Sequence, residues 1–254
     1  MRKDAVAGAL PRPAQRYEVL SFVTGRTAFD QLSVDPERNS QMLPAMKASR
    51  LLQTAVCLAL TALPTLHAKE SPAFDLREGD IVFSSSARGQ GEAVIAATGS
   101  PYTHCGIVFE KDGQLMVLEA VQPVGVTTLK DFIAHSRPEI FTARRLKFTV
   151  TPEARQKARE WALAQIGRDY DARFAWDDGK LYCSELVWKI YQHAGVELCP
   201  PRHFRDYDLQ RPAVRKIVEQ RYGGMDRLPL DEKVVAPSDL AASGLLMEVP
   251  RKAE

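Results

Sequence analysis

Between residues 79 and 150, apolar positions come in short runs that alternate with polar ones, which is the period-two pattern of β-strands. Turn-forming residues bound these runs, and Asp112-Gly113 is the strongest hairpin signal among them. Two short helices are expected between the strands, at 88–99 and at 131–135. The predicted strands cover residues 81–83, 103–109, 115–121, 124–129 and 140–146.

After residue 150 the apolar positions follow a helical period. Thr151 supplies an N-cap, Pro152 suits the first turn and Glu153 suits the positive helix end. The helices predicted from this pattern cover residues 151–166, 183–194 and 214–220, and a short last segment opens at 237–240. Strands followed by helices gathered to one side predict an α+β fold with helices packed on an antiparallel sheet.

A different pattern precedes these elements. Lys47 and Arg50 lead into an apolar stretch that ends at Leu66, and the small residue Ala68 follows shortly after it. This is the layout of a secretory signal peptide at 46–68, and the stretch is too short for a good membrane-spanning helix. A buried core helix is the alternative. A lipoprotein attachment site at Cys57 is disfavoured by the bulky residue before it.

The signal pattern begins at Met46 instead of at the start of the chain. We therefore expect Met46 to be the true initiator and residues 1–45 to be a mis-called or disordered extension. Export would place the domain at 69–254 in the periplasm, without a stable membrane span after signal removal. Release of a protein that starts near residue 69 would support this expectation.

The net charge of the chain and its distribution limit which partners are expected. The chain has 34 basic and 32 acidic residues, a net charge of +2, and no concentrated basic stripe. Nucleic acid is therefore not an expected partner. Its 254 residues, 45% hydrophobic, are enough to bury a core without disulfides or metal. A monomer or weak dimer is expected.

Sequence motifs exclude several chemistries. Neither HExxH nor CxxC spacing occurs, and His135, His193 and His203 are scattered, so neither a catalytic metal nor a cofactor is expected. The GxSxG motif of common serine hydrolases is also missing. Removal of the signal peptide leaves an odd number of cysteines, so at least one thiol stays free.

Cys183 stands out among these thiols. It opens a predicted helix and shares the apolar stripe that includes Val187 and Ile190, so its side chain should point inward. In the first helical turn, unpaired N–H groups and the helix dipole lower a thiol pKa and favour the attacking thiolate. The same N–H groups could donate to an oxyanion. The plainer interpretation of Cys183 is a small core residue.

His104 and Glu119 form the candidate base and orienting acid. A two-residue Asp112-Gly113 loop sets Gly106 opposite Glu119, so Glu119 becomes the diagonal neighbour of His104 on one face of the hairpin. Gly106 has no side chain and leaves room for the carboxylate to reach the imidazole. A three-residue loop would turn Glu119 to the other face. A purely structural His–Glu pair is the alternative.

The remaining candidates are weaker. Cys105 follows His104 directly, so it should face the other side of the strand, beyond the reach of that base, and serve as core. Cys199 lies in a proline-rich loop. Aromatic residues and an arginine that could line a cleft are Tyr102, Tyr182, Trp176 and Arg173.

Three segments together resemble the NlpC-type cysteine peptidases. They are Leu76-Arg77-Glu78-Gly79-Asp80-Ile81-Val82-Phe83, His104-Cys105-Gly106-Ile107-Val108 and Tyr182-Cys183-Ser184-Glu185-Leu186. In the ordinary family the Cys helix comes first, whereas here it comes last. That order resembles the circularly permuted YiiX/YebB-like branch. The resemblance spans about residues 74–245, including Arg221-Tyr222-Gly223 and Pro237-Ser238-Asp239-Leu240.

The resemblance implies a permuted papain-like fold with Cys183 as nucleophile, His104 as base and Glu119 as orienting acid. Asp80 matches a structural loop. The implied reaction is hydrolysis of amides in cell-wall peptides through a thioester. Permuted relatives also include lipid acyl hydrolases and acyltransferases, so an acyl substrate is the alternative. A non-catalytic binding module is a third interpretation, which the intact Cys, His and Glu disfavour.

Overall fold

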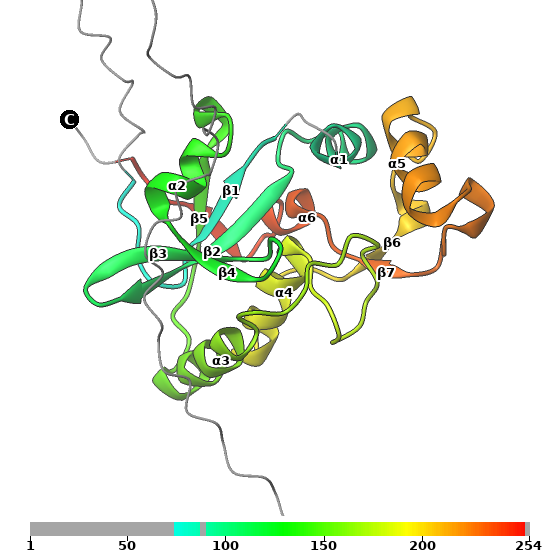
Figure 1. The fold of residues 1–254 in the computed structure, drawn as a ribbon. Coiled ribbons are helices and arrows are strands. Elements are labelled where there is room, and N and C mark those ends of the chain that lie inside the picture. The colour runs from blue at the N-terminus through cyan, green and yellow to red at the C-terminus, as the bar shows by residue number, and fades with distance from the viewer. Residues whose placement is uncertain (1–73, 87–89, 252–254) are drawn as a thin grey trace, which may run out of the picture. The chain divides into compact units, whose positions relative to one another are not determined.

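The computed structural model describes residues 74–86 and 90–251, so the expected extension at 1–45 and signal peptide at 46–68 lie outside the described residues. Six strands form one antiparallel sheet in the order β4-β3-β2-β1-β5-β8 (Figure 1). The strands are β1 (Ile81–Ser84), β2 (His104–Lys111), β3 (Gln114–Glu119), β4 (Gly125–Thr128), β5 (Thr142–Leu146) and β8 (Leu246–Glu248). The α+β prediction is confirmed.

The β2–β3 hairpin has the predicted two-residue loop. Lys111 pairs with Gln114, and Val108 pairs with Val117. Asp112 and Gly113 adopt the positive φ angles, 54° and 76°, that such a tight turn requires. The predicted strand was too long, because β3 ends at Glu119 and Val121 lies beyond it, 39% exposed. The register places Glu119 on the expected face.

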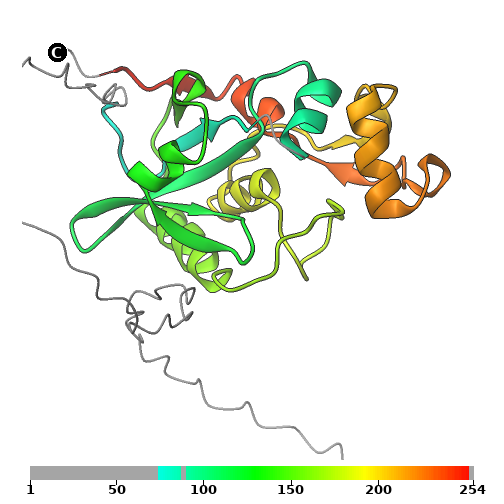
Figure 2. The ribbon, with the colours of Figure 1, turned by 45° about the horizontal axis from the view of Figure 1, so that its top comes forward.

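Helices cover both faces of the sheet. Figures 1 and 2 show α3 and α4 together on one face, α2 on the other, and α1 beside α5. The helices are α1 (Gln90–Thr98), α2 (Leu129–Ala134), α3 (Pro152–Ala164), α4 (Cys183–His193), α5 (Pro212–Tyr222) and α6 (Pro237–Ala241). A second sheet pairs β6 (Arg202–His203) with β7 (Lys233–Val234). Strands of two or three residues carry no readable period, so β6, β7 and β8 were not predicted.

The longest helix follows its predicted start signals. The hydroxyl of Thr151 accepts a hydrogen bond from the backbone N–H of Ala154, at 3.2 Å, and Pro152 occupies the first turn. The helix ends at Ala164, two residues before the expected end at Ile166, whose side chain is 46% exposed. Only the extent of the helix was overestimated.

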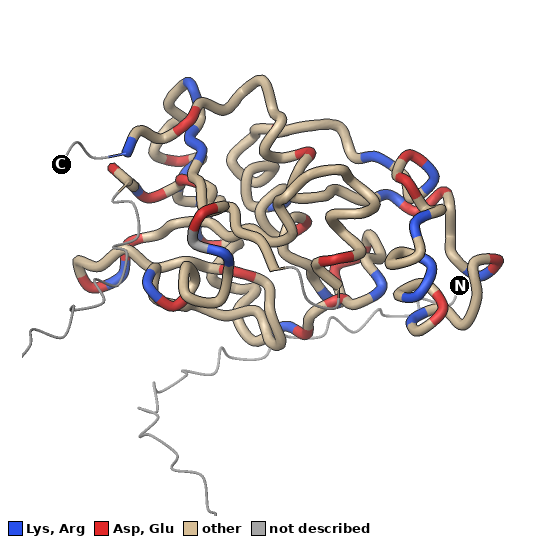
Figure 3. Tube along the Cα trace, turned by 90° about the horizontal axis from the view of Figure 1, so that it is seen from above, with Lys and Arg blue, Asp and Glu red and all other residues tan. Residues whose placement is uncertain are grey.

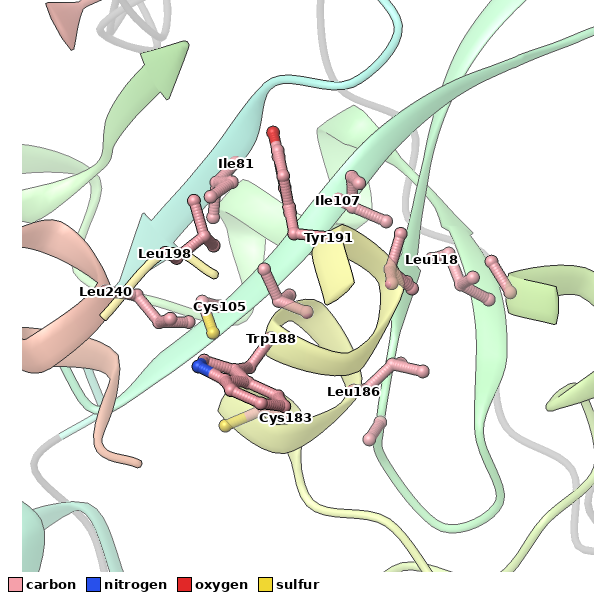
Figure 4. Packing of buried hydrophobic residues seen from close by; sticks show 14 of the residues in the cluster. Ile81, Cys105, Ile107, Leu118, Cys183, Leu186, Trp188, Tyr191, Leu198 and Leu240 are labelled. Carbon is pink, nitrogen blue, oxygen red and sulfur yellow. The ribbon is translucent and has the colours of Figure 1, made fainter. Parts of the chain in front are cut away.

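The core helix α4 is more deeply buried than an amphipathic pattern suggests. Every residue from Cys183 to Tyr191 is buried. The helix packs against β2, α3 and α6, so it has no solvent face along this length (Figure 4). The predicted apolar stripe was therefore too narrow, because Trp188 and Lys189 lie inside as well.

Asp80 serves the structural role that was expected. Its carboxylate receives Nε and Nη2 of Arg145 at 2.7 and 2.8 Å, and the backbone N–H of Arg77 at 2.8 Å. This bidentate pair joins the start of β1 to β5. Elsewhere, Lys and Arg are interspersed with Asp and Glu along the described chain (Figure 3). None of the described helices is both long enough and apolar enough to cross a membrane.

Candidate active site

Cys183 is the first residue of α4, and its position is fixed from both sides. The carboxylate of Glu185 accepts the backbone N–H of Tyr182, the N-cap residue, at 3.4 Å. The hydroxyl of Ser184 donates to the carbonyl of Val235, at 2.6 Å. Cys183 itself is 4% exposed. The thiol therefore sits in the positive end of a helix whose first turn is held in place.

His104 and Glu119 meet as the predicted register requires. Nε2 of His104 lies 2.5 Å from Oε2 of Glu119, and the carboxylate is buried, with 5% of its side chain exposed. Because Glu119 occupies Nε2, Nδ1 is the ring nitrogen left to exchange a proton with a thiol. Phe132 of α2 stacks on the imidazole, with ring centroids 5.5 Å apart. The ring orientation is thus set by two neighbours.

The second carboxylate oxygen of Glu119 is held as well. The hydroxyl of Thr127, on β4, donates to Oε1 at 2.6 Å. The sequence interpretation missed Thr127, although the β3–β4 register supplies a signal: Glu119 pairs with Gly125, so Thr127 is its diagonal neighbour on the same face. Thr127 thus holds the carboxylate of Glu119, and Phe132 holds the imidazole of His104.

Gly106 makes the His–Glu contact possible. A Cβ at this position would lie 2.5 Å from Cγ1 of Val117 and 3.3 Å from Cβ of Glu119. The first distance is shorter than real side-chain contacts allow. The expectation that this glycine leaves room for Glu119 is confirmed, and the space is shared with Val117.

The electrostatics of the site favour a thiolate–imidazolium pair. A hydrogen bond from Cys105 and the charge of His104 outweigh burial, and they hold the pKa of Cys183 well below its ordinary value. Burial alone would lower the pKa of His104, but the neighbouring Cys183 thiolate and Glu119 raise it to about 10. Burial opposes ionisation of Glu119, yet its bonds to His104 and Thr127 lower its pKa. The three predicted residues therefore interact as one unit, and their catalytic roles stay predictions.

Cys105 is a core residue, as expected. It is fully buried on the face of β2 that packs against α4, opposite the face where His104 stacks on Phe132, as predicted. Its thiol also helps to depress the pKa of the neighbouring Cys183. Figure 4 shows both sulfurs among the buried side chains between β2 and α4. Cys183 thus meets residues from both faces of β2 at the end of that strand.

Tyr170 is a further neighbour of the thiol that sequence reasoning missed. Burial and the nearby charge of Cys183 raise its pKa. Its hydroxyl accepts Nε2 of Gln90 at 2.7 Å, so its own proton remains free to be donated. A backbone bridge between Tyr170 and Leu181 brings it beside the start of α4. No local pattern marks this residue, because only the chain path between α3 and α4 places it there.

An apolar cavity of about 110 Å³ opens beside Cys183. Helices α1 and α5 form its walls, and the chain between α3 and α4 adds Phe174. Of the proposed cleft residues, Tyr182 lines the cavity, whereas Tyr102, Trp176 and Arg173 do not. Representative lining side chains are Ala93, Val94, Phe174, Phe204, Ile217 and Val218. The Cys183 residue therefore borders an apolar space.

The other thiol and histidine candidates lie apart from this unit. Cys105, Cys183 and Cys199 are all free, and burial raises the pKa of Cys199 to about 12. His193 stacks on Trp161, with centroids 4.6 Å apart. Among residues 74–86 and 90–251, no three His, Cys, Asp or Glu side chains are grouped to hold a metal ion.

Comparisons with known proteins identify the family to which the chain belongs. Residues 75–249 match the family model described as permuted papain-like amidase enzyme, YaeF/YiiX, C92 family. The chain is 37% identical over 166 residues to the protein YiiX of Escherichia coli (strain K12), covering 65% of this chain and 81% of that protein. A crystal structure titled metalloprotein yiiX, from Escherichia coli O157:H7, matches with a TM-score of 0.64 and 34% identity, covering 72% of this chain and 99% of that one.

Proposed function

The chain belongs to the YaeF/YiiX (C92) family of permuted papain-like amidases, and on this premise we propose that it hydrolyses an amide with an apolar acyl group through a thioester on Cys183. One observation carries the proposal: the thiol that pairs with His104 is also a wall of the apolar cavity. A carbonyl carbon held over the sulfur would leave its acyl chain in that cavity.

In the first half of the proposed reaction, the Cys183 thiolate attacks the carbonyl carbon and a C–S bond forms. The carbonyl π electrons move to oxygen, where the N–H groups opening α4 and the free proton of Tyr170 can donate hydrogen bonds. When the oxyanion collapses, the C–N bond breaks. The leaving nitrogen takes the Nδ1 proton of His104 and departs as an amine, so the imidazole becomes neutral.

In the second half, water replaces the amine. Nδ1 of His104 takes a proton from water as the oxygen attacks the thioester carbon. The C–S bond then breaks, the thiolate returns and the acid departs. Glu119 stays ionised and stabilises the imidazolium at both stages, as the orienting acid of a triad does. Thr127 keeps that carboxylate aligned.

The cavity also supports one of the two substrate classes that the sequence left open. Peptide stems of cell walls are polar, and an apolar wall gives them few hydrogen-bond partners. A fatty acyl group instead loses apolar surface to water when it enters such a space. The proposal therefore ranks an acyl amide above a cell-wall peptide. The proposal also includes export, on the basis of the signal pattern at 46–68. It further includes a monomeric or weakly dimeric state.

Intact-protein mass spectrometry tests the proposal directly. Residues 69–254 would be incubated with an N-dodecanoyl amide or with purified sacculi and quenched in acid. We expect a dodecanoyl adduct on Cys183, released amine in excess of enzyme, and neither in Cys183→Ala. Peptidyl adducts from sacculi, with the dodecanoyl amide untouched, would restore the cell-wall assignment. No adduct from either source would favour the non-catalytic module.

A further inference from the structure

Arg221 brings a positive charge to the apolar cavity. It lies on α5, and it is the one Lys, Arg, Asp or Glu among the cavity's lining residues that the structure describes. The segment Arg221-Tyr222-Gly223 belongs to the part of the sequence that resembles the permuted family, but the proposed reaction gives it no task. Arg221 is half-buried, and its place in an apolar wall needs an explanation, because taking a charge even partly out of water without a contacting counter-charge is unfavourable.

The hydrogen-bond partners of Arg221 are neutral. Nη1 donates to the carbonyl of Ala172 at 2.6 Å, and Nη2 donates to the side-chain oxygen of Gln90. The guanidinium also lies over the ring of Phe174, 5.3 Å from its centroid. Within the described part of the chain, no carboxylate lies within 4.0 Å of it. Burial accordingly lowers its pKa.

Two cations that hold the fold together differ in this respect. Arg145 forms its bidentate pair with Asp80, and Lys189 lies 2.8 Å from Glu185 and 2.9 Å from Asp178. Asp171, whose charge acts on Arg221 without a direct contact, is engaged by the backbone N–H groups of Arg173 and Ala175. Arg221 is thus held by neutral partners, and no described carboxylate is in direct contact with it.

Gln90 connects this charge to the catalytic centre. Its amide oxygen accepts Arg221, and its amide nitrogen donates to the hydroxyl of Tyr170, whose phenol senses the charge of Cys183. Arg221, Gln90 and Cys183 also line the same cavity. A ligand group bound by Arg221 would lie close to the scissile bond.

We propose that Arg221 binds an anionic group, a carboxylate or a phosphate, on the amine side of the scissile amide. The charge belongs to the amine part because the acyl group in the cavity is apolar. Guanidinium presents paired N–H donors that match carboxylate and phosphate oxygens. This inference rests on the proposed function and narrows its substrates to N-acyl amino acids or N-acyl aminoalkyl phosphates.

Binding to the inactive Cys183→Ala protein tests this without turnover. Three probes share a dodecanoyl chain: N-dodecanoylglycine, N-dodecanoyl-O-phosphoethanolamine and the neutral N-dodecanoylethanolamine. Calorimetry should show at least one anionic probe binding about tenfold or more tightly than the neutral one, and the stronger anion identifies the group. Equal affinities, or no binding of either anion, would overturn the proposal.

Variants separate recognition from structural support. Arg221→Met should bring the anionic probe down to the neutral probe's affinity, whereas Arg221→Lys should keep part of the preference. Arg215→Met is the matched control, since Arg215 is an exposed arginine on the same helix and does not line the cavity. If Arg221→Met and Arg221→Lys each weaken all three probes equally, Arg221 is structural and the proposal fails. A missing dodecanoyl adduct on active Cys183 would instead contradict the proposed function alone.

Discussion

The Thr127 hydroxyl donates to one oxygen of Glu119, at 2.6 Å, while the other oxygen faces His104 at 2.5 Å. The carboxylate therefore has a fixed rotation, and so does the ring that it holds. Removing the hydroxyl should loosen both without changing any charge.

We expect Thr127→Val to lower kcat about tenfold with little change in KM, because the base would be less often aligned while the cavity is unchanged. Steady-state kinetics with an N-dodecanoyl amide measures this. Thr127→Ser keeps the donor and should stay near wild type. A Thr127→Val enzyme with full kcat would show that Glu119 needs no second partner.

Removal of catalytic groups should be strongly non-additive. Cys183→Ala and His104→Ala should each abolish turnover, and the double variant should be no worse, because the residues act as one unit. Glu119→Gln should leave residual activity, since it removes only the orienting charge. Cys105→Ser, which keeps a donor for the thiolate, should stay active. If a folded Cys105→Ser protein is as inactive as Cys183→Ala, the nucleophile has been misassigned.

Thiol labelling should separate Cys183 from Cys199. The pKa of Cys183 lies well below its ordinary value, whereas burial raises that of Cys199 to about 12. Near neutral pH, iodoacetamide should therefore modify Cys183 first, as peptide mapping would show. Cys105→Ala should slow this labelling at low pH, because Cys105 helps to depress the pKa of Cys183. Equal rates at the two thiols across pH would contradict the ion pair.

Activity should follow a bell-shaped pH profile. The acid limb of kcat/KM reports the depressed pKa of the thiol, and the alkaline limb reports loss of the imidazolium proton near pH 10.

The raised pKa of His104 also makes the stability of the protein depend on pH. The folded pKa of His104 is above its ordinary 6.5, so its stabilising contribution is complete below pH 6.5 and is lost as pH rises through about 10. The Tm difference between wild type and His104→Ala should shrink accordingly. A difference that grows with pH would refute this assignment.

Gly106→Ala should lower both stability and activity. The new Cβ would clash with Cγ1 of Val117 and press on Glu119, so we expect a loss of about 1–3 kcal/mol in the free energy of unfolding. Adding Val117→Ala removes the clashing methyl and should recover activity in part. Denaturant unfolding and kcat measure the two effects. Full activity in Gly106→Ala alone would mean that the Glu119–His104 contact does not depend on the space that Gly106 leaves.

Removing only one partner of the Glu185–Lys189 pair should lower the free energy of unfolding more than replacing both partners. Glu185 is fully buried, and Lys189 also donates to the carbonyl of Asp177 at 2.8 Å. Lys189→Met leaves a buried carboxylate unpaired and should cost about 3–5 kcal/mol. The double variant Glu185→Leu/Lys189→Met should be distinctly more stable than Lys189→Met. Chemical denaturation compares them, and simple additivity would show that the two side chains are not coupled.

The parts that sequence predicted correctly depend on local rules. The Asp112-Gly113 loop fixes the hairpin register, and that register alone brings His104 to Glu119. Thr151 and Pro152 fix the start of α3 in the same way. Local rules could not reveal the positions of Tyr170 and Arg221. Their contacts with Gln90 join segments that are 80 and 131 residues apart in the chain. Their positions follow from tertiary packing, which no periodicity encodes.

The order of elements along the chain has a consequence for the growing protein on the ribosome. The strands that carry His104 and Glu119 emerge early, and their hairpin needs only neighbouring residues to pair. The helix that carries Cys183 emerges after them, and the α5 wall of its cavity later still. Because folding during synthesis proceeds from the N-terminus, His104 has no Cys183 thiol beside it until most of the chain is made. Under the proposed mechanism, an unfinished chain would therefore lack the thiol that attacks amides.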